Sequence, residues 1–129
     1  MAGAVFVRVK VEGTSALTAK LGLVGNVVRL GVGYATYNMA RTIKSTARAV
    51  VPVVKGDLQR GIEATKLGVY DWVVTASSIA GGADREYAPY VEHGTYKMAA
   101  RPFMAPGVEA GRRAALENLA AVAASIERL

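Results

Sequence analysis

The adjacent residues Glu92 and His93 are the part of the sequence best suited to acid–base chemistry, because a carboxylate can work together with an imidazole. Neighbouring residues of a helix point about 100° apart, however, so these two side chains do not face each other. His93 is also the only histidine, and no Ser-His-Asp set can be assembled around it. We therefore expect His93 to be an exposed residue without a catalytic role.

Residues for a metal or a cofactor are equally sparse. With one histidine, no cysteine and acids that occur singly, no set of metal ligands can be assigned. The stretch GVG at 31–33 lacks the third glycine and the preceding strand of a dinucleotide fingerprint. The stretch VVKGDL at 53–58 lacks the GxxxxGK[ST] frame of a phosphate-binding loop. The sequence therefore predicts a protein with no catalytic activity, no metal and no cofactor.

The length and composition of the chain indicate one ordinary globular domain. The chain has 129 residues, of which 52% are hydrophobic and 20% are charged. The absence of cysteine suits a reducing cytoplasm, or a particle assembled inside one. Arg8 and Lys10 interrupt the apolar start, so we expect neither a signal peptide nor a membrane-spanning segment there.

Positive charge is concentrated in one segment. The net charge is +6, and no acid occurs between Glu12 and Asp57. An excess of this kind favours contact with a polyanion such as DNA, although a solvated helix face is the plain alternative. Arg41, Lys44 and Arg48 fall within about 60° of one another on a helical wheel. The six candidate DNA-contacting residues are Lys20, Arg29, Arg41, Lys44, Arg48 and Lys55.

Hydrophobic periodicity predicts an α+β fold, with a long N-terminal helix and a C-terminal helix packed on a small antiparallel sheet. Alternation of valines with Phe6, Arg8 and Lys10 is typical of a strand with one wet face. Glycines at 22–25 or 31–33 should either break the long helix or mark a close approach of another backbone. The expected order is a strand at 1–13, a helix at 14–51, a turn and β-hairpin at 52–78, a loop, short helix and extended arm at 79–106, and a helix at 107–129. In the turn, Asp57 is expected to cap a short helical segment that runs to Ile62.

The stretch from Arg85 to Pro106 contains three of the six tyrosines. A proline at 89 and a glycine at 94 frame a short helix, on which Tyr87, Tyr90 and Val91 share one face. The following prolines predict an extended arm at 96–104. Its large apolar side chains are Met98, Phe103 and Met104, and we expect them to pack against an adjacent subunit.

This stretch, YAPYVEHGTYKMAARPFMAPG, resembles the signature of the gene-product-ten family of minor tail components of tailed phages. That signature runs Tyr-Ala-x-Tyr-Val-Glu-x-Gly-Thr, then a methionine, then Arg-Pro-Phe-Leu-x-Pro. The turn AVVPVVKGDLQRGI also resembles the family pattern, with Lys55 and Gly61 departing from its usual Thr and Ser. The matching positions are Pro52, Gly56, Leu58, Ile62, Tyr87, Ala88, Tyr90, Val91, Glu92, Gly94, Thr95, Met98, Arg101, Pro102, Phe103 and Pro106.

The resemblance implies a non-enzymatic virion protein of the phage head–tail joint, a neck, tail-completion or tail-terminator protein assembled in the cytoplasm of the host bacterium. Such subunits form a ring, expected here to contain six copies. The ring adjoins head-closure or connector proteins on one side and tail-tube or terminator proteins on the other, and genomic double-stranded DNA passes through its lumen. No membrane is involved. The implied subunit interface comprises Tyr87, Tyr90, Val91, Glu92, Gly94, Thr95, Met98, Arg101, Pro102 and Phe103.

Two other classes stay open from the sequence. One is a small basic module of cellular origin that binds DNA without sequence preference, for which a steep salt dependence of duplex affinity is the expected sign. The other is a small enzyme, for which loss of turnover on His93→Ala is the expected sign.

Overall fold

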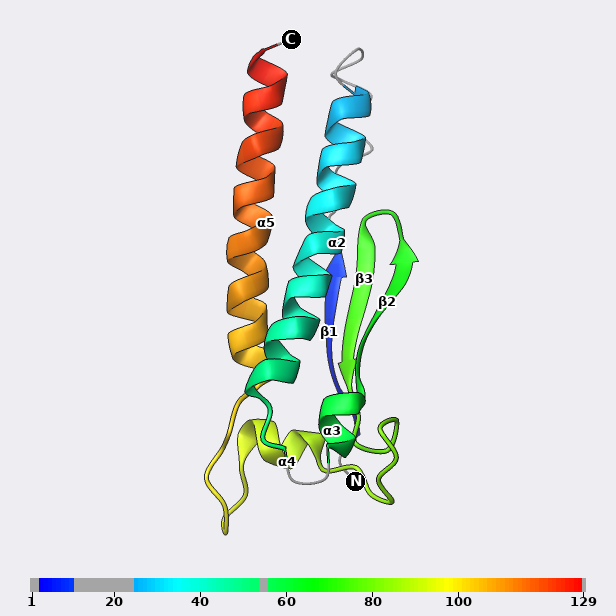
Figure 1. The fold of residues 1–129 in the computed structure, drawn as a ribbon, viewed down its shortest axis with the longest axis vertical. Coiled ribbons are helices and arrows are strands. Elements are labelled where there is room, and N and C mark those ends of the chain that lie inside the picture. Colours follow the sequence, from blue (N-terminus) through cyan, green and yellow to red (C-terminus); the bar gives the residue numbers. More distant parts are fainter. Residues whose placement is uncertain (1–2, 11–24, 54–55, 129) are drawn as a thin grey trace.

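The computed structural model describes residues 3–10, 25–53 and 56–128. Within these ranges the chain is an α+β domain in which helices pack on a three-stranded antiparallel sheet (Figure 1). No helix in the described ranges has the length and apolar character needed to cross a membrane. The elements are β1 (Val5–Lys10), α2 (Gly25–Val50), α3 (Asp57–Arg60), β2 (Ile62–Gly68), β3 (Asp71–Ala76), α4 (Ala88–His93) and α5 (Met104–Glu127).

The sheet has the order β1-β3-β2, so the hairpin strand β3 is central. Val5 lies opposite Ala76, and Ile62 lies opposite the same residue on the other side. The buried side chains of Ile62, Val74 and Ala76 therefore share the face that packs on α2. Phe6 and Arg8 lie on the opposite, solvent-facing side, as the alternation of β1 predicts.

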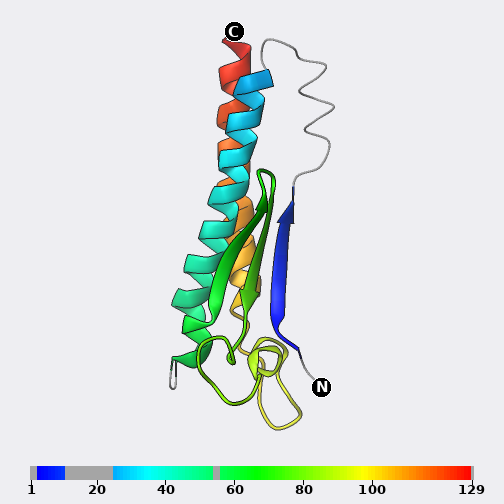
Figure 2. The same ribbon diagram turned by 90° about the vertical axis from the view of Figure 1, so that its right-hand side faces the viewer.

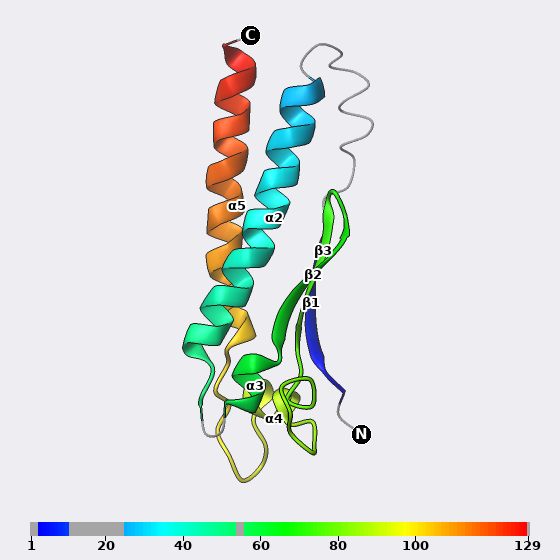
Figure 3. The same ribbon diagram turned by 45° about the vertical axis from the view of Figure 1, so that its right-hand side comes forward.

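Helix α2 forms the middle layer, with α5 on one side and the sheet on the other (Figures 1 and 3). Its residues Ile43 and Ala47 are fully buried and join the apolar residues of the sheet in one core. Figure 2 shows that the upper halves of α2 and α5 extend beyond the sheet. These halves therefore present helix surface that the sheet does not cover.

The expected break at Gly31–Gly33 is wrong, because α2 is one helix from Gly25 to Val50. The other expectation for these glycines was the close approach of another backbone, whereas at Gly31 the close neighbour is a side chain of α5. A Cβ atom placed there would lie 2.3 Å from Cγ2 of Val122 on α5. Gly111 on α5 is similarly close to the backbone oxygen of Met39. Small residues thus let the two long helices approach closely. The predicted helical residues 14–24 lie outside the described residues.

Two boundaries at the lower end also differ from expectation. Helix α3 begins after Gly56, which has a φ of 80°, and the side chain of Asp57 accepts a hydrogen bond from Arg60 instead of capping the helix. Helix α5 begins at Met104, so Pro106 lies in its first turn. Proline is tolerated there because the first-turn N–H groups have no partner within the helix. The arm is therefore shorter than predicted.

Candidate interaction surfaces

The side chain of Glu92 caps the start of α5. Its carboxylate is buried and accepts hydrogen bonds from the backbone N–H groups of Phe103, Met104 and Ala105 at 2.8, 3.0 and 3.1 Å. These are N–H groups that the helix itself leaves unsatisfied, and the positive end of the helix dipole favours a carboxylate beside them. Glu92, predicted as an interface residue, thus holds α4 to α5 within its own chain.

Hydrogen bonds close the loop between α4 and α5 at its base. The N–H of Arg101 donates to the carbonyl oxygen of Val91 at 2.8 Å. Gly94 has a φ of 78°, and a Cβ there would lie 2.7 Å from the backbone nitrogen of Ala100. At the tip, backbone hydrogen bonds link Thr95 and Met98 in both directions, and Tyr96 is 94% exposed. The predicted arm is therefore a short, internally bonded loop with a solvent-facing tyrosine.

The prediction that Phe103 anchors a neighbouring subunit is wrong. Phe103 is 0% exposed and belongs to the chain's own core, and Met104 is buried beside it. The reason is that α5 begins directly after Phe103 and turns it inward against the sheet and α2. In the same loop Thr95, Met98, Arg101 and Pro102 are exposed. These four remain available for contact with another molecule.

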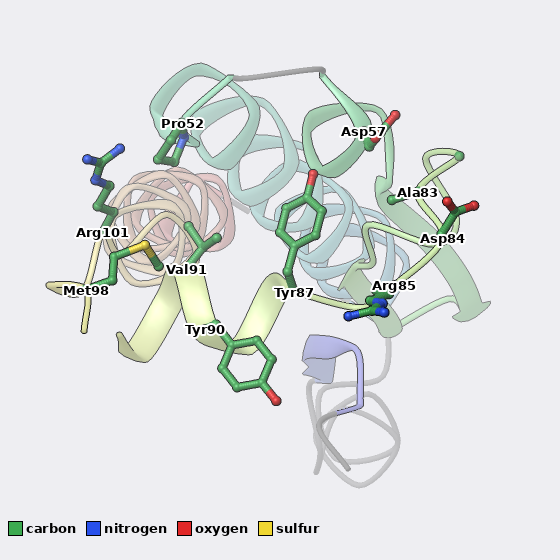
Figure 4. Close-up of a pocket in the computed structure, with 11 residues that line it drawn as sticks. Pro52, Asp57, Ala83, Asp84, Arg85, Tyr87, Tyr90, Val91, Met98 and Arg101 are labelled. Atoms are coloured by element: carbon green, nitrogen blue, oxygen red, sulfur yellow. The ribbon is translucent and has the colours of Figure 1, made fainter. Parts of the chain in front are cut away.

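An open cavity of about 740 Å³ lies at the end of the molecule that carries α4. Figure 4 shows Met98 and Arg101 on one side of it and Asp57 and Asp84 on the other, with Tyr87 between them. Tyr87 and Val91 also contact the core, whereas Tyr90 is exposed. The three residues predicted to share a face of the short helix therefore all line this cavity, and two of them also pack inward.

Glu86 orders the loop that leads into α4. Its carboxylate accepts hydrogen bonds from the hydroxyl of Ser77 at 2.6 Å and from the N–H of Ser78 at 2.9 Å. Burial raises the pKa of Glu86, but the hydrogen bonds from Ser77, Ser78 and Ala88 outweigh it, so the pKa lies below its ordinary value. The sequence gives no signal for this role, because the serines become partners of Glu86 only once the loop closes.

Two cations of the basic segment of α2 form ion pairs with an acid on β2. Nζ of Lys44 lies 3.1 Å from Oε2 of Glu63 on β2, and Nη2 of Arg48 lies 2.8 Å from Oε1 of the same residue. Arg48 also donates to the carbonyl oxygen of Ile62. An acid from the hairpin therefore partly neutralises two of the predicted DNA-contacting cations. Lys20 and Lys55 lie outside the described residues.

Arg29 and Arg41 flank a surface that we call the aromatic groove. It has a volume of about 430 Å³, and no acid is among the described residues that line it. The ring centroids of Tyr37 and Trp72 lie 5.5 Å apart, and the guanidinium carbon of Arg41 lies 6.0 Å from the Tyr37 ring. The lining residues are Arg29, Leu30, Gly33, Tyr34, Tyr37, Lys66, Val69 and Trp72. The spacing of Leu30, Tyr34 and Tyr37 on one face of α2 was the sequence signal for this groove, and it was missed.

A second uncovered surface is the outer face of α5, which comprises Leu116, Ala120 and Ala123. These three residues are exposed and follow the i, i+4, i+7 spacing of one helix face, away from the α2 contact at Gly111 and Val122. The exposed Arg112 and Arg113 lie one turn before Leu116, and Glu117 follows it. The surface is thus a small apolar patch bordered by charges of both signs.

Within the described residues, no three His, Cys, Asp or Glu side chains lie close enough together to hold a metal ion. His93 is exposed at the end of α4. The absence of catalysis stays a prediction. Comparison of the chain with protein-family models, with curated proteins and with solved structures finds no significant match.

Proposed function

We propose that this chain is a structural subunit of the head–tail joint of a tailed phage, and that copies of it form a ring through which DNA passes. The phage assignment rests on the resemblance of the stretch from Tyr87 to Pro106 and on nothing in the comparisons. The structure supplies a physical reason for that pattern. Glu92, Gly94 and Phe103 act together to fix the junction between α4 and α5.

The observation that carries assembly is the pair of uncovered apolar surfaces. The aromatic groove exposes Leu30 and Tyr34, and the outer face of α5 exposes Leu116. Large exposed apolar patches on a small protein typically mark contacts with other proteins. Among the residues that the structure describes, nothing covers Leu30, Tyr34 or Leu116, so these side chains are suited to burial between copies in a ring.

Fewer residues are proposed to contact DNA than the sequence suggested. Lys44 and Arg48 are engaged with Glu63, which leaves Arg29 and Arg41 as the predicted DNA-contacting cations on the described part of α2. Phosphate contacts by Lys and Arg are sequence-independent, which suits DNA that must slide. The proposed neighbours remain head-closure or connector proteins and tail-tube or terminator proteins, with the virion as the location.

Two measurements test this proposal. Light scattering and negative-stain electron microscopy of the purified chain should show a closed ring of defined mass. Gold-labelled antibodies on tailed particles that contain the chain should mark the joint between head and tail. Labelling along the capsid or the tail tube, or absence of the chain from purified particles, would overturn the phage assignment.

A non-specific DNA-binding module is the second candidate, favoured by cations beside the exposed aromatic rings of the groove. If the chain binds duplex DNA in this way, Glu63→Gln should strengthen low-salt binding, because Lys44 and Arg48 would be released to contact phosphate. Fluorescence anisotropy against salt concentration measures this. If the unaltered chain and Glu63→Gln bound duplex DNA with equal, weak affinity at low salt, a duplex-DNA-binding function would be excluded.

A further inference from the structure

We propose that the aromatic groove is a binding site for single-stranded nucleic acid, in which unpaired bases stack on Tyr37 and Trp72 and phosphates contact the neighbouring cations. The inference goes beyond the proposed ring, which requires only that double-stranded DNA pass through it, and it does not depend on that ring. The ligand is defined by two chemical features that occur together, a flat aromatic base and an anionic phosphate. Single-stranded DNA and single-stranded RNA share both features.

The first support is the arrangement of the aromatic rings in the groove, which lies between α2 and the hairpin (Figure 3). The rings of Tyr34, Tyr37 and Trp72 follow one another with centroid separations of 6.2 and 5.5 Å. All three line the same space of about 430 Å³. Every base has a π-face, so bases stack on aromatic side chains without regard to sequence. A duplex keeps its bases stacked inside, and these rings are therefore suited to bases that are unpaired.

The second support is the placement of cations on both walls of the groove. On α2, Tyr34, Tyr37 and Arg41 share one face by spacings of three and four residues. The guanidinium carbon of Arg41 lies 6.0 Å from the centroid of the Tyr37 ring. On the other wall, Lys66 of β2 lies opposite Trp72 of β3. A strand whose bases enter the groove would therefore meet a cation on each wall, and Lys and Arg are the usual partners of phosphate.

The acids near the groove are already paired with cations, so they do not cancel this positive charge. No acid is among the described residues that line the groove. Asp71, at the start of β3, accepts hydrogen bonds from the guanidinium of Arg8. Glu63, further along β2, is contacted by both Lys44 and Arg48. The surface around the groove is therefore positive, which suits a polyanion.

A second copy of the chain is the competing occupant of the groove, and the charges favour it less. The outer face of α5 carries the exposed Arg112 and Arg113 beside Leu116. This face would therefore bring further cations to a groove that already contains Arg29 and Lys66. Single-stranded nucleic acid matches both the aromatic rings and the positive charge.

The contact between copies proposed above involves only the rim of the groove, which is formed by Leu30 and Tyr34. These two residues are 75% and 56% exposed. Tyr37 is 39% exposed and Trp72 is half-buried, so these two rings form the floor of the groove. A neighbouring copy that contacted the rim would leave the floor and Arg41 open to a strand, and the two uses of this surface are compatible.

Trp72 makes the site directly observable, because it is the only tryptophan of the chain. Titration of the full chain with an oligothymidylate of about 12 nucleotides should quench its fluorescence, since bases would stack beside the indole. A duplex of the same length should bind about tenfold more weakly. Absence of quenching by any single strand, or a duplex that binds as tightly as the strands, would overturn the inference.

An oligouridylate of the same length distinguishes the two sources of the ligand. Both single strands should quench Trp72, because both offer bases and phosphates. The 2′-hydroxyl is the group by which a protein tells RNA from DNA. Tighter binding of the oligouridylate would assign RNA as the ligand, and tighter binding of the oligothymidylate would assign DNA.

Two variants separate base stacking from phosphate contact. Tyr37→Leu removes a ring without changing the charge, so the affinity for the oligothymidylate should fall about tenfold while its salt dependence is unchanged. Arg41→Gln, at an exposed position, keeps the rings, and the slope of log affinity against log salt should become shallower by about 0.7. If neither variant, folded by circular dichroism, differed from the unaltered chain, the inference would fail.

Tyr96→Leu is the matched control for loss of an aromatic ring. Tyr96 also lies beside a cation, with Nζ of Lys97 5.4 Å from its ring centroid, but it is on the loop between α4 and α5, outside the groove. Its replacement should leave oligothymidylate binding unchanged. A loss as large as that of Tyr37→Leu would show that exposed tyrosines bind the strand wherever they lie, and would overturn the assignment of the groove.

The outcomes separate this inference from the proposed function. Quenching of Trp72 by single strands, without labelling of the head–tail joint, would support the inference and overturn the phage proposal. Labelling of the joint without quenching would do the reverse. If Tyr37→Leu changed the mass of the assembly by light scattering but left oligothymidylate binding unchanged, the floor of the groove would be a contact between copies and the inference would fail.

Discussion

The carboxylate of Glu92 accepts the backbone N–H of Phe103 at 2.8 Å, across 11 residues of sequence. This one contact joins the end of α4, the loop that projects Tyr96, and the start of α5. It also places the side chain of Phe103 in the core. Glu92 and Phe103 belong to the signature that first suggested a subunit interface. In this chain both residues orient the long C-terminal helix.

Loss of the Glu92 carboxylate should destabilise the fold. We expect Glu92→Ala to lower the free energy of unfolding by about 2–3 kcal/mol, because three backbone N–H groups, two of them buried, lose their acceptor. Glu92→Gln should cost less, since its amide oxygen can still accept hydrogen bonds. Urea denaturation measures both. The matched control is His93→Ala at the exposed neighbouring position, and an equal loss there would contradict the capping role.

Phe103→Ala should weaken the isolated subunit itself. Removing a fully buried phenylalanine typically costs about 3–5 kcal/mol, from lost apolar burial and from the cavity left behind. Tyr96→Ala, seven positions away on the exposed loop tip, should leave the unfolding midpoint within experimental error. Thermal unfolding of monomeric protein at low concentration distinguishes the two. A stable Phe103→Ala monomer would show that the core tolerates the cavity.

Gly61 should not accept a side chain. A Cβ there would lie 1.7 Å from the backbone oxygen of Ser77, a contact that neither residue can relieve by rotating a side chain. We expect Gly61→Ala to cost about 3 kcal/mol or more, or to prevent folding. Gly68→Ala is the matched control, because its nearest neighbour would be Cβ of Asp71 at an ordinary 3.8 Å. Similar urea midpoints for the two variants would refute this close approach.

Glu86 should contribute stability that disappears in acid. Its pKa is lowered in the folded chain, so the unfolded chain binds more protons as the pH falls. The contribution is therefore complete above the ordinary glutamate pKa of about 4.3 and is lost as the pH falls through the lower folded value. The stability difference between the unaltered chain and Glu86→Gln should shrink between about pH 6 and about pH 3. Parallel stability profiles over that range would count against the hydrogen-bonded loop.

The sequence predicted the elements that a periodic pattern defines. The alternation at Val5–Lys10, the two runs of the hairpin and the apolar stripe of α5 all correspond to observed elements. The start of α5 was placed too late, because Pro106 is compatible both with an arm and with a first helical turn.

The sequence could not predict which side chains contact one another, because the fold brings together residues that are far apart in the chain. Glu63 lies outside the acid-free segment, so counting charges along the chain separated it from Lys44 and Arg48, although the hairpin brings the three together. Phe103 was assigned to a neighbour because it follows a proline in an apparently extended stretch. Only the position of α5 relative to the sheet shows that the same chain buries it.

The sheet order has a consequence for synthesis on the ribosome. Strand β1 is made early, but its partner in the sheet is β3, and the contact of Arg8 with Asp71 spans 63 residues. At about 5–20 residues per second, β1 waits for about 3–13 s before that partner has been translated. During this interval its valines have no sheet to join, and an unpaired apolar strand is prone to aggregate with other nascent chains. Slow or paused translation between β1 and β3 should therefore lower the yield of folded protein without altering the stability of the chains that do fold.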